Sequence, residues 1–246
     1  MTEPDLPKKR RKRKRIPKER PPRQDAVETS WRLFLAVPLP APVVTLVGEL
    51  VQDLSAEAWP VRWVAADTAH ITLQFLGETT PERAELLRLA LPGVVARHER
   101  FRLRTADLGV FPNQNRPRVL WLGLYGPTHR LSTLHAEIAT LLRDYDFPAD
   151  DGGFHPHITL GRVRDVRNEP VRDLPAKIVA RFRQEAESGR ASAANAIPVP
   201  VDEVVLYRSI LTRAGSRYEA VVRCALGERV GGENAVSRPA GADGPA

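Results

Sequence analysis

The chain has 246 residues, of which 42% are hydrophobic, 27% charged and 6% aromatic, a composition that suits a sizeable globular core and excludes a mini-protein or a fibre. Its formal net charge is +7, but residues 1–24 hold eleven basic and three acidic side chains, so the other 222 residues carry 26 basic against 27 acidic groups. Because the body is close to neutral, its composition does not indicate a protein that binds nucleic acid through bulk charge.

The two ends of the chain differ in composition from its middle. Residues 1–28 combine five prolines with eight consecutive cations from Lys8 to Arg15, a sequence that repels itself and has little to bury, which predicts a disordered basic tail. Residues 228–246 are rich in glycine, alanine and proline without apolar periodicity, which predicts a second flexible tail. We therefore expect one globular domain over residues 29–227.

The cellular compartment follows from features that the sequence lacks. A single cysteine excludes an internal disulfide framework and a cysteine-bound zinc or iron–sulfur centre. No run approaches the roughly eighteen apolar residues that a membrane span needs, and the charged block near the N-terminus is not followed by the apolar stretch of a secretory signal. We expect a monomer in the cytoplasm that makes no contact with a membrane.

Short strand patterns and helical patterns alternate along the domain. Strands are predicted at 31–37, 61–64, 69–76, 101–108, 119–124, 156–163, 204–210 and 218–226, and helices at 42–57, 81–97, 128–145 and 171–187. Thr80 followed by Pro81 is typical of a helix N-terminus, and Pro92 is expected to bend that helix or end it early. This order predicts an α+β fold with a mainly antiparallel sheet. No glycine-rich loop joins a strand to a helix, so dinucleotide-binding and P-loop folds are excluded and no cofactor is expected.

One four-residue string, His-Ile-Thr-Leu, occurs at 70–73 and again at 157–160. Side chains alternate along a strand, so the histidine and threonine of each copy point to one face while isoleucine and leucine point to the other. If the repeat marks two halves of a symmetric domain, the two imidazoles face each other across one cleft. A plain structural interpretation is two unrelated strand histidines beside ordinary β-forming threonines. Two identical copies in a chain with only six histidines favour a functional pair.

Two histidines on either side of a phosphodiester can share its hydrolysis. One of His70 and His157 would be neutral and accept a proton from water, while the other would donate a proton to the departing oxygen. The hydroxyls of Thr72 and Thr159 would donate hydrogen bonds to the phosphate oxygens, where charge develops. This reaction needs no metal ion, and the carboxylates near either copy show no metal-ligand spacing.

The sequence around both copies resembles the bacterial and archaeal RNA 2′,3′-cyclic phosphodiesterases, the LigT-like members of the two-histidine (2H) phosphoesterase superfamily, also described as 2′-5′ RNA ligases. The similarity extends from about residue 31 to about residue 226 and leaves the basic tail outside. It is carried by RLFLAVPLP at 32–40, HITLQFLGE at 70–78, FP at 111–112, RVLWLG at 118–123, FHPHITLGR at 154–162, and LYRS at 206–209 with Gly215 and Tyr218.

The resemblance implies a bilobal α+β fold in which two mainly antiparallel sheets, related by a pseudo-twofold with helices outside, each contribute one motif to a central cleft. His70 would be the general acid that protonates the leaving ribose oxygen, and His157 the general base that activates water. Thr72 and Thr159 would hold the phosphate, and Arg162 would neutralise it or hold the nucleic-acid backbone. The implied reaction is metal-independent opening of an RNA 2′,3′-cyclic phosphate end to a 2′-phosphate.

Other functions are compatible with the same cleft. The enzymatic alternatives are 2′-5′ ligation of RNA halves and cleavage of a small cyclic nucleotide, and the non-enzymatic alternative is an RNA-binding module, against which the intact histidine–threonine pairs argue. The run from Lys8 to Arg15 has three interpretations, in decreasing order of preference: non-specific contact with RNA phosphates, a passive solubilising extension and, in a eukaryote, a nuclear import signal.

The remaining histidine, cysteine and tryptophan residues have simpler interpretations. His155 shares a strand face with His157, but no third ligand is indicated, so exposure or a contact with the substrate is preferred to a metal site. Cys224 lies among apolar residues and is expected to be a small buried hydrophobe. Trp63 and Trp121 are either core residues or platforms for base stacking. The other histidines are expected at the surface: His98, His129 and His135.

Overall fold

The computed structural model describes residues 30–147, 153–164, 173–189, 196–213 and 215–228. The two predicted tails fall outside these ranges, apart from Glu228, and the described elements begin at Trp31 and end at Ala225. In chain order they are β1 (Trp31–Pro38), α1 (Ala41–Ser55), β2 (Val61–Trp63), the 3-10 helix η1 (Ala66–Thr68), β3 (His70–Thr79), α2 (Pro81–Val95), β4 (Phe101–Phe111), β5 (Val119–Tyr125), α3 (Thr128–Asp144), β6 (Ile158–Val163), α4 (Leu174–Ser188), β7 (Pro198–Val201), β8 (Glu203–Thr212) and β9 (Gly215–Ala225).

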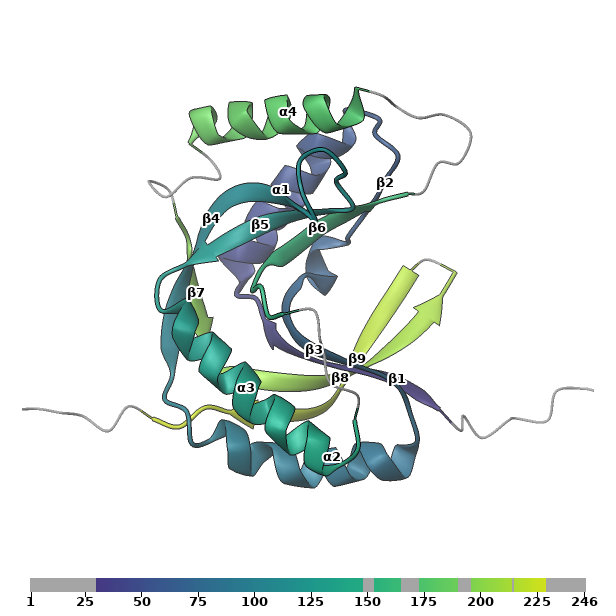
Figure 1. The fold of residues 1–246 in the computed structure, drawn as a ribbon, viewed down its shortest axis with the longest axis vertical. Helices are drawn as coiled ribbons and strands as arrows, with labels where there is room; N and C mark the ends of the chain where they lie inside the picture. The colour runs from purple at the N-terminus through teal and green to yellow at the C-terminus, as the bar shows by residue number, and fades with distance from the viewer. Residues whose placement is uncertain (1–29, 148–152, 165–172, 190–195, 214, 229–246) are drawn as a thin grey trace, which may run out of the picture.

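The strands form a curled antiparallel sheet in the order β7-β4-β5-β6-β3-β1-β8-β9, with β2 added to β6 (Figure 1). Counted outward from the boundary between β3 and β6, its two halves are β3-β1-β8-β9 and β6-β5-β4-β7. A single register pair, Ile71 with Ile158, joins the halves at this boundary. The predicted α+β fold is confirmed, and the two predicted sheets prove to be continuous through this one pair.

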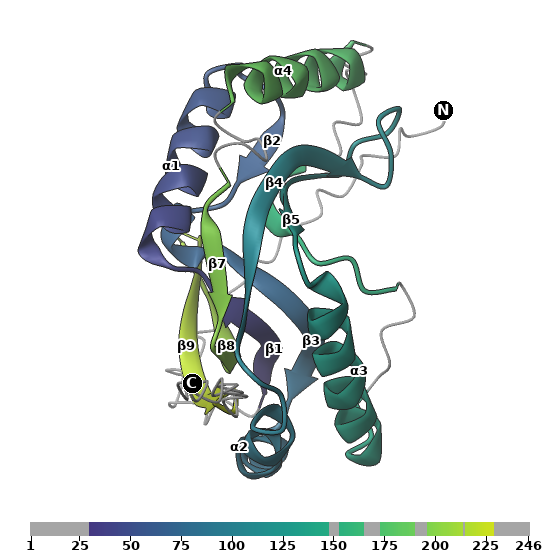
Figure 2. The ribbon, with the colours of Figure 1, turned by 90° about the vertical axis from the view of Figure 1, so that its left-hand side faces the viewer.

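The helices cover the two halves from outside (Figures 1 and 2). Helix α1 packs on β2 and β6 and α4 on β4, whereas α2 packs on β8 and β9 and α3 on β3. Helix α1 follows β1 but packs on the half that contains β6, and helix α3 follows β5 but packs on the half that contains β3. This exchange ties the halves together, so the seam between β3 and β6 is held from both sides. None of the helices in the described ranges is long and apolar enough to cross a membrane.

Apolar periodicity explains why these helices form and where they pack. Helix α1 has proline in its first turn, and its apolar positions recur every three or four residues on the face that contacts the sheet. A fully buried leucine on such a face stabilises the fold by about 1.5–3 kcal/mol. The buried residues of α1 are Val43, Leu46, Val47, Leu50 and Leu54.

Two differences from the sequence-based expectation involve proline. Strand β7, with Pro198 and Pro200, was not predicted, because proline cannot donate to a strand ladder. Among the described strands it lies at the edge of the sheet and pairs only with β4, where a missing donor can be tolerated. Helix α2 continues through Pro92 to Val95 instead of ending early, while the predicted cap is confirmed: the Thr80 hydroxyl accepts a hydrogen bond from the Arg83 amide.

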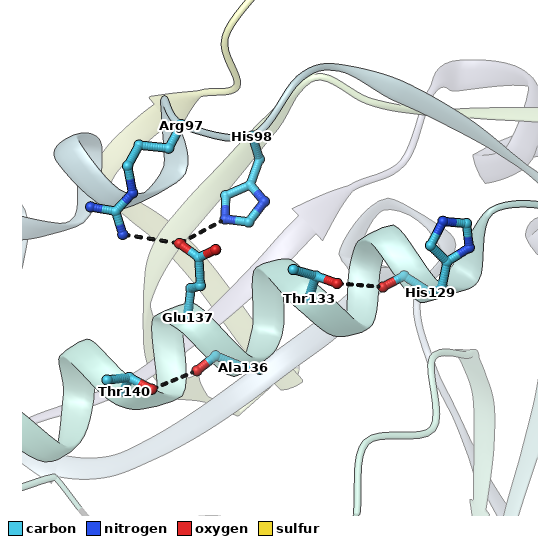
Figure 3. A network of polar contacts seen from close by, with 7 residues as sticks. All are labelled: Arg97, His98, His129, Thr133, Ala136, Glu137 and Thr140. Atoms are coloured by element: carbon cyan, nitrogen blue, oxygen red, sulfur yellow. Dashed lines mark hydrogen bonds and ion pairs between the residues drawn. The ribbon is translucent and has the colours of Figure 1, made fainter.

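A polar contact joins the end of α2 to α3 (Figure 3). The Glu137 carboxylate accepts a 2.9 Å hydrogen bond from Arg97 and lies 3.3 Å from Nε2 of His98. The hydrogen bond from Arg97 holds the pKa of Glu137 below its ordinary value. Arg97 is largely exposed, so the pair contributes little to stability. The expectation of a surface position is wrong for His98, whose side chain is 13% exposed, and holds for His129.

Candidate active site

The two His-Ile-Thr-Leu strings meet at the seam between the halves of the sheet. Ile71 and Ile158 are register partners in antiparallel strands and both are fully buried. Their neighbours therefore point to the opposite, open face, with His70 across from Thr159 and Thr72 across from His157. The second histidine lies one residue before β6, and not inside a strand as predicted. The backbone thus brings the two histidines and the two threonines of the strings to one place.

Both imidazoles are held in the same way by their own chain. Nδ1 of His70 lies 2.8 Å from the Thr68 carbonyl oxygen, and Nδ1 of His157 lies 2.7 Å from the His155 carbonyl oxygen. A carbonyl oxygen only accepts, so Nδ1 must carry the proton in each ring. The neutral tautomer then has its lone pair on Nε2. Each ring is oriented so that Nε2 can accept a proton, or donate one once the ring is charged.

A β-bulge follows the threonine in both copies. Ala36 pairs with Thr72 and Leu35 with Gln74, so Leu73 is the extra residue in β3. In β6, Leu160 lies in the same way between the partners of Trp121 and Leu120. A bulge reverses the alternation of side chains beyond it.

The bulges return the sixth residue of each copy to the open face. Leu73 and Gln74 are both buried in β3, as are Leu160 and Gly161 in β6, and the next residues, Phe75 and Arg162, are exposed. The two halves therefore present an apolar ring and a guanidinium at equivalent positions. Phe75 was not predicted, although aligning the two copies beyond the fourth residue would have found it.

A cavity of about 290 Å³ lies over this seam. It contains four of the five predicted residues, and the β8–β9 hairpin, which extends beyond the sheet in Figure 1, supplies one wall. Leu211 of that hairpin and Phe75 are 67% and 57% exposed, so the wall is partly apolar. The lining residues are Arg32, Phe34, Val64, Thr68, Ala69, His70, Thr72, Phe75, Thr159, Arg162, Ser209, Leu211, Ser216 and Tyr218.

Aromatic rings fix the two histidines. His70 lies 4.9 Å from the Phe34 ring and makes an edge contact with Tyr218 at 5.5 Å. His157, which does not line the cavity itself, makes an edge contact with Phe111 at 5.0 Å and lies 6.5 Å from Trp121. Sequence reasoning left the role of Trp121 open and assigned no role beside the histidines to the other three rings, because no spacing along the chain links them to the histidines.

The environment favours the neutral form of both imidazoles. Burial lowers the pKa of His70 from its ordinary value, and the nearby His157 and Arg162 lower it further, while the hydrogen bond to the Thr68 carbonyl opposes these effects. Burial also lowers the pKa of His157, again with a contribution from Arg162 and against the bond to the His155 carbonyl. Both rings are therefore available as bases near neutral pH, and either one, once protonated, is a stronger acid than an ordinary imidazolium.

The remaining candidates take no direct part in this arrangement. The side chain of His155 is exposed, and its carbonyl orients His157. No group of three or more His, Cys, Asp or Glu side chains in the described ranges is placed to hold a metal ion. Cys224 is buried, which raises its pKa to about 11 and keeps the thiol unreactive. Trp63 packs against Trp59 and the core.

His135 differs from the surface position predicted for it. Its ring stacks on Phe154 at a centroid distance of 4.2 Å with an interplanar angle of 6°. Phe154 precedes His155 in the segment that leads into β6. The stack therefore anchors that segment to α3 close to the second histidine.

Comparison with known proteins identifies the family of the chain. A family model described as the 2′-5′ RNA ligase superfamily matches residues 40–212, which is more than half of the chain. The chain belongs to the 2′-5′ RNA ligase superfamily. Its curated relatives include an RNA 2′,3′-cyclic phosphodiesterase of Aeropyrum pernix, 34% identical over 191 residues and covering 75% of this chain and 100% of that protein. Another, of the same name, from Escherichia coli K12 is 33% identical over 209 residues, 79% of this chain and 96% of that one.

Solved structures of the superfamily share the fold. E. coli LigT without ligand matches with a TM-score of 0.59 and 27% identity, over 81% of this chain and 99% of that one. E. coli LigT in complex with phosphate matches with a TM-score of 0.56 and 29% identity, with the same coverage. The 2′-5′ RNA ligase superfamily and the LigT-type fold predicted from the sequence are therefore confirmed.

Proposed function

We propose that the protein hydrolyses 2′,3′-cyclic phosphate ends of RNA to 2′-phosphates without a metal ion. The observation that carries the proposal is the pair of imidazoles at the seam, each with Nδ1 bound to a backbone carbonyl and Nε2 left for proton transfer. The names of the curated relatives, RNA 2′,3′-cyclic phosphodiesterases, support a hydrolase with this substrate.

In the proposed reaction, water attacks the phosphorus atom and the bond from phosphorus to the 3′ oxygen breaks. Nε2 of neutral His157 accepts the proton that water loses, and Nε2 of protonated His70 donates the proton that the 3′ oxygen gains. A phosphoryl group remains on the 2′ oxygen. The assignment of donor and acceptor follows the family resemblance, and the equivalent anchoring of the two rings is compatible with it.

The other cavity residues suit the two parts of such a substrate. The hydroxyls of Thr72 and Thr159 are available as donors to the non-bridging phosphate oxygens, and the guanidinium of Arg162 offsets their charge. Phe75, whose position in β3 is equivalent to that of Arg162 in β6, presents an apolar ring to the ribose or the base. E. coli LigT, which shares the fold, binds phosphate in a crystal.

The proposal is tested by incubating the purified protein with EDTA and an oligonucleotide that ends in a 2′,3′-cyclic phosphate. We expect turnover in EDTA, and its loss by at least about 10²-fold in His70→Ala and His157→Ala, because each general acid or base contributes about 10²–10⁴-fold. His129→Ala, an exposed histidine of α3, is the matched control. Activity that EDTA abolishes, or that either site variant retains in full, contradicts the proposal, and tight RNA binding without turnover supports a binding module instead.

An aryl phosphodiester separates the two roles, because a nitrophenolate leaves without being protonated. His70→Ala should keep much more of its activity on this substrate than His157→Ala. If His157→Ala instead keeps more activity than His70→Ala, then His157 is the proton donor and His70 the acceptor.

The description of the matching family favours ligation as a second candidate. A 5′ hydroxyl of RNA that replaces water at the same cyclic phosphate forms a 2′-5′ bond with the same two proton transfers. Adding an RNA with a free 5′ hydroxyl to the assay and resolving joined from hydrolysed products compares the two reactions.

A further inference from the structure

Two arginines lie directly opposite each other beside the cavity. Strand β2 adds to β6 with Arg62 as the register partner of Arg162, and both side chains are exposed. Like charges at directly opposed positions destabilise a sheet. The sheet avoids this arrangement elsewhere: Arg32 of β1 faces Glu78 of β3 and forms an ion pair with it at 3.2 Å.

No carboxylate in the described part of the chain forms an ion pair with Arg62 or Arg162. Neighbouring strands are about 4.8 Å apart, so the Cβ atoms of the two arginines lie close together and the two guanidiniums repel each other. An anion between them would remove the repulsion. Arginine pairs with phosphate through two parallel hydrogen bonds, which makes phosphate the anion that suits this position.

The pair is continuous with the proposed catalytic site. Arg162 lines the cavity with His70 and Thr159. Arg62 lies next to Arg162, on the neighbouring strand β2. Val64 and Thr68, from the segment that connects β2 to β3, line the same cavity. The charges of both arginines also act on the Tyr218 hydroxyl in the cavity, where they oppose the increase in its pKa caused by burial.

We propose that Arg62 binds the internucleotide phosphodiester that precedes the terminal cyclic phosphate, and that Arg162 lies between these two phosphates and offsets the charge of both. The enzyme then acts on oligonucleotide ends in preference to cyclic mononucleotides, which lack that phosphate. This inference rests on the proposed function, since it names the substrate class of the same site. It also explains how a nearly neutral body selects RNA: two opposed guanidiniums lie where two successive phosphates bind.

The test compares kcat/KM for a cyclic mononucleotide and for a short oligonucleotide with a cyclic phosphate end, in the natural protein, Arg62→Gln, Arg62→Lys and Arg102→Gln. We expect Arg62→Gln to reduce the preference for the oligonucleotide by about tenfold, because a charge-assisted hydrogen bond of this kind is lost. Arg62→Lys should be intermediate, since it keeps the charge and loses the fork. Arg102→Gln, an exposed arginine of β4, should leave the preference unchanged.

Binding of an oligonucleotide that ends in a 2′-phosphate, measured at several salt concentrations, tests the inference independently of turnover. Arg62→Gln should weaken binding and make the slope of log K against log salt shallower by about one. Its melting temperature should be equal to or above that of the natural protein, because a repulsion is removed. Unchanged preference and unchanged binding in Arg62→Gln overturn the inference. Turnover of neither substrate by the natural protein contradicts the proposed function, and the binding comparison still decides the role of Arg62.

Discussion

At the scale of single residues, the site depends on which ring nitrogen is free. Each histidine donates from Nδ1 to the carbonyl of the residue two positions before it, Thr68 in one half and His155 in the other. The backbone therefore selects the tautomer, and no carboxylate is needed to orient the ring. Burial lowers both pKa values, so both rings favour the neutral form that accepts a proton. Protonation of either ring is correspondingly less favourable.

Replacement of Arg162 tests this electrostatic account. The Arg162 cation lowers the pKa of both histidines, so Arg162→Gln removes a charge that disfavours their protonated forms and both values rise. We expect both limbs of the bell-shaped profile of kcat/KM against pH to move to higher pH, together with a fall in kcat/KM of about tenfold or more from weaker phosphate binding. Arg102→Gln is the control. A lower rate with unmoved limbs would show that Arg162 binds phosphate without tuning the imidazoles.

At the scale of elements, the β-bulges decide what the cavity contains. Each His-Ile-Thr-Leu string ends in a buried leucine and is followed by one more buried residue and then by a residue on the open face, Phe75 in β3 and Arg162 in β6. Strict alternation would place Gln74 and Gly161 on that face instead. The bulges therefore give the cavity one apolar side and one cationic side, although the two strings are identical.

Gly161 is the residue that lets β2 approach β6. A Cβ at this position would lie 2.5 Å from Cγ1 of Val61 and 2.9 Å from the Trp63 ring, so Gly161→Ala must shift these two side chains of β2, which flank Arg62. We expect a loss of about 1–3 kcal/mol in the free energy of unfolding, measured by urea denaturation, because overpacking forces such shifts.

The matched control for Gly161→Ala is Gly93→Ala in α2, where a Cβ meets nothing within 4 Å. Alanine should stabilise that helix by about 0.5–1 kcal/mol. Equal effects of the two substitutions would show that β2 is free to move away from β6.

At the scale of the whole molecule, the two halves of one sheet meet at one register pair. Helices α1 and α3 each pack on the half that does not contain the strand before them, so neither half is independent of the other. A cavity at such a seam receives residues from strands that are far apart in the chain. The basic segment precedes the described body in the sequence and lies outside the described residues.

Removal of residues 1–24 tests the role of the basic segment. These residues carry a net charge of +8, and we expect their loss to weaken binding to single-stranded RNA and to reduce the salt slope of that binding. Turnover of a cyclic mononucleotide should not change, because the proposed catalytic residues lie in the described body. Unchanged affinity and salt slope would instead identify the segment as a passive extension.

Much of this protein follows from its sequence. Hydrophobic periodicity is a local property, so the strands, the helices and the α+β class could be predicted, and the repeated string together with the residues around it indicated the family and the five candidate site residues. Strand β7 was missed because its prolines are acceptable only at a sheet edge, and the position of an edge is not local.

The tertiary structure decided which residues meet. Pairing of β3 with β6, addition of β2, and packing of Phe34, Phe111 and Tyr218 around the histidines all join segments that are distant in the chain. A bulge is visible only against a partner strand, so the exposure of Phe75 could not be read from alternation. The opposed pair of Arg62 and Arg162 has the same origin: strand register, which is set by packing, brings together two charges separated by a hundred residues.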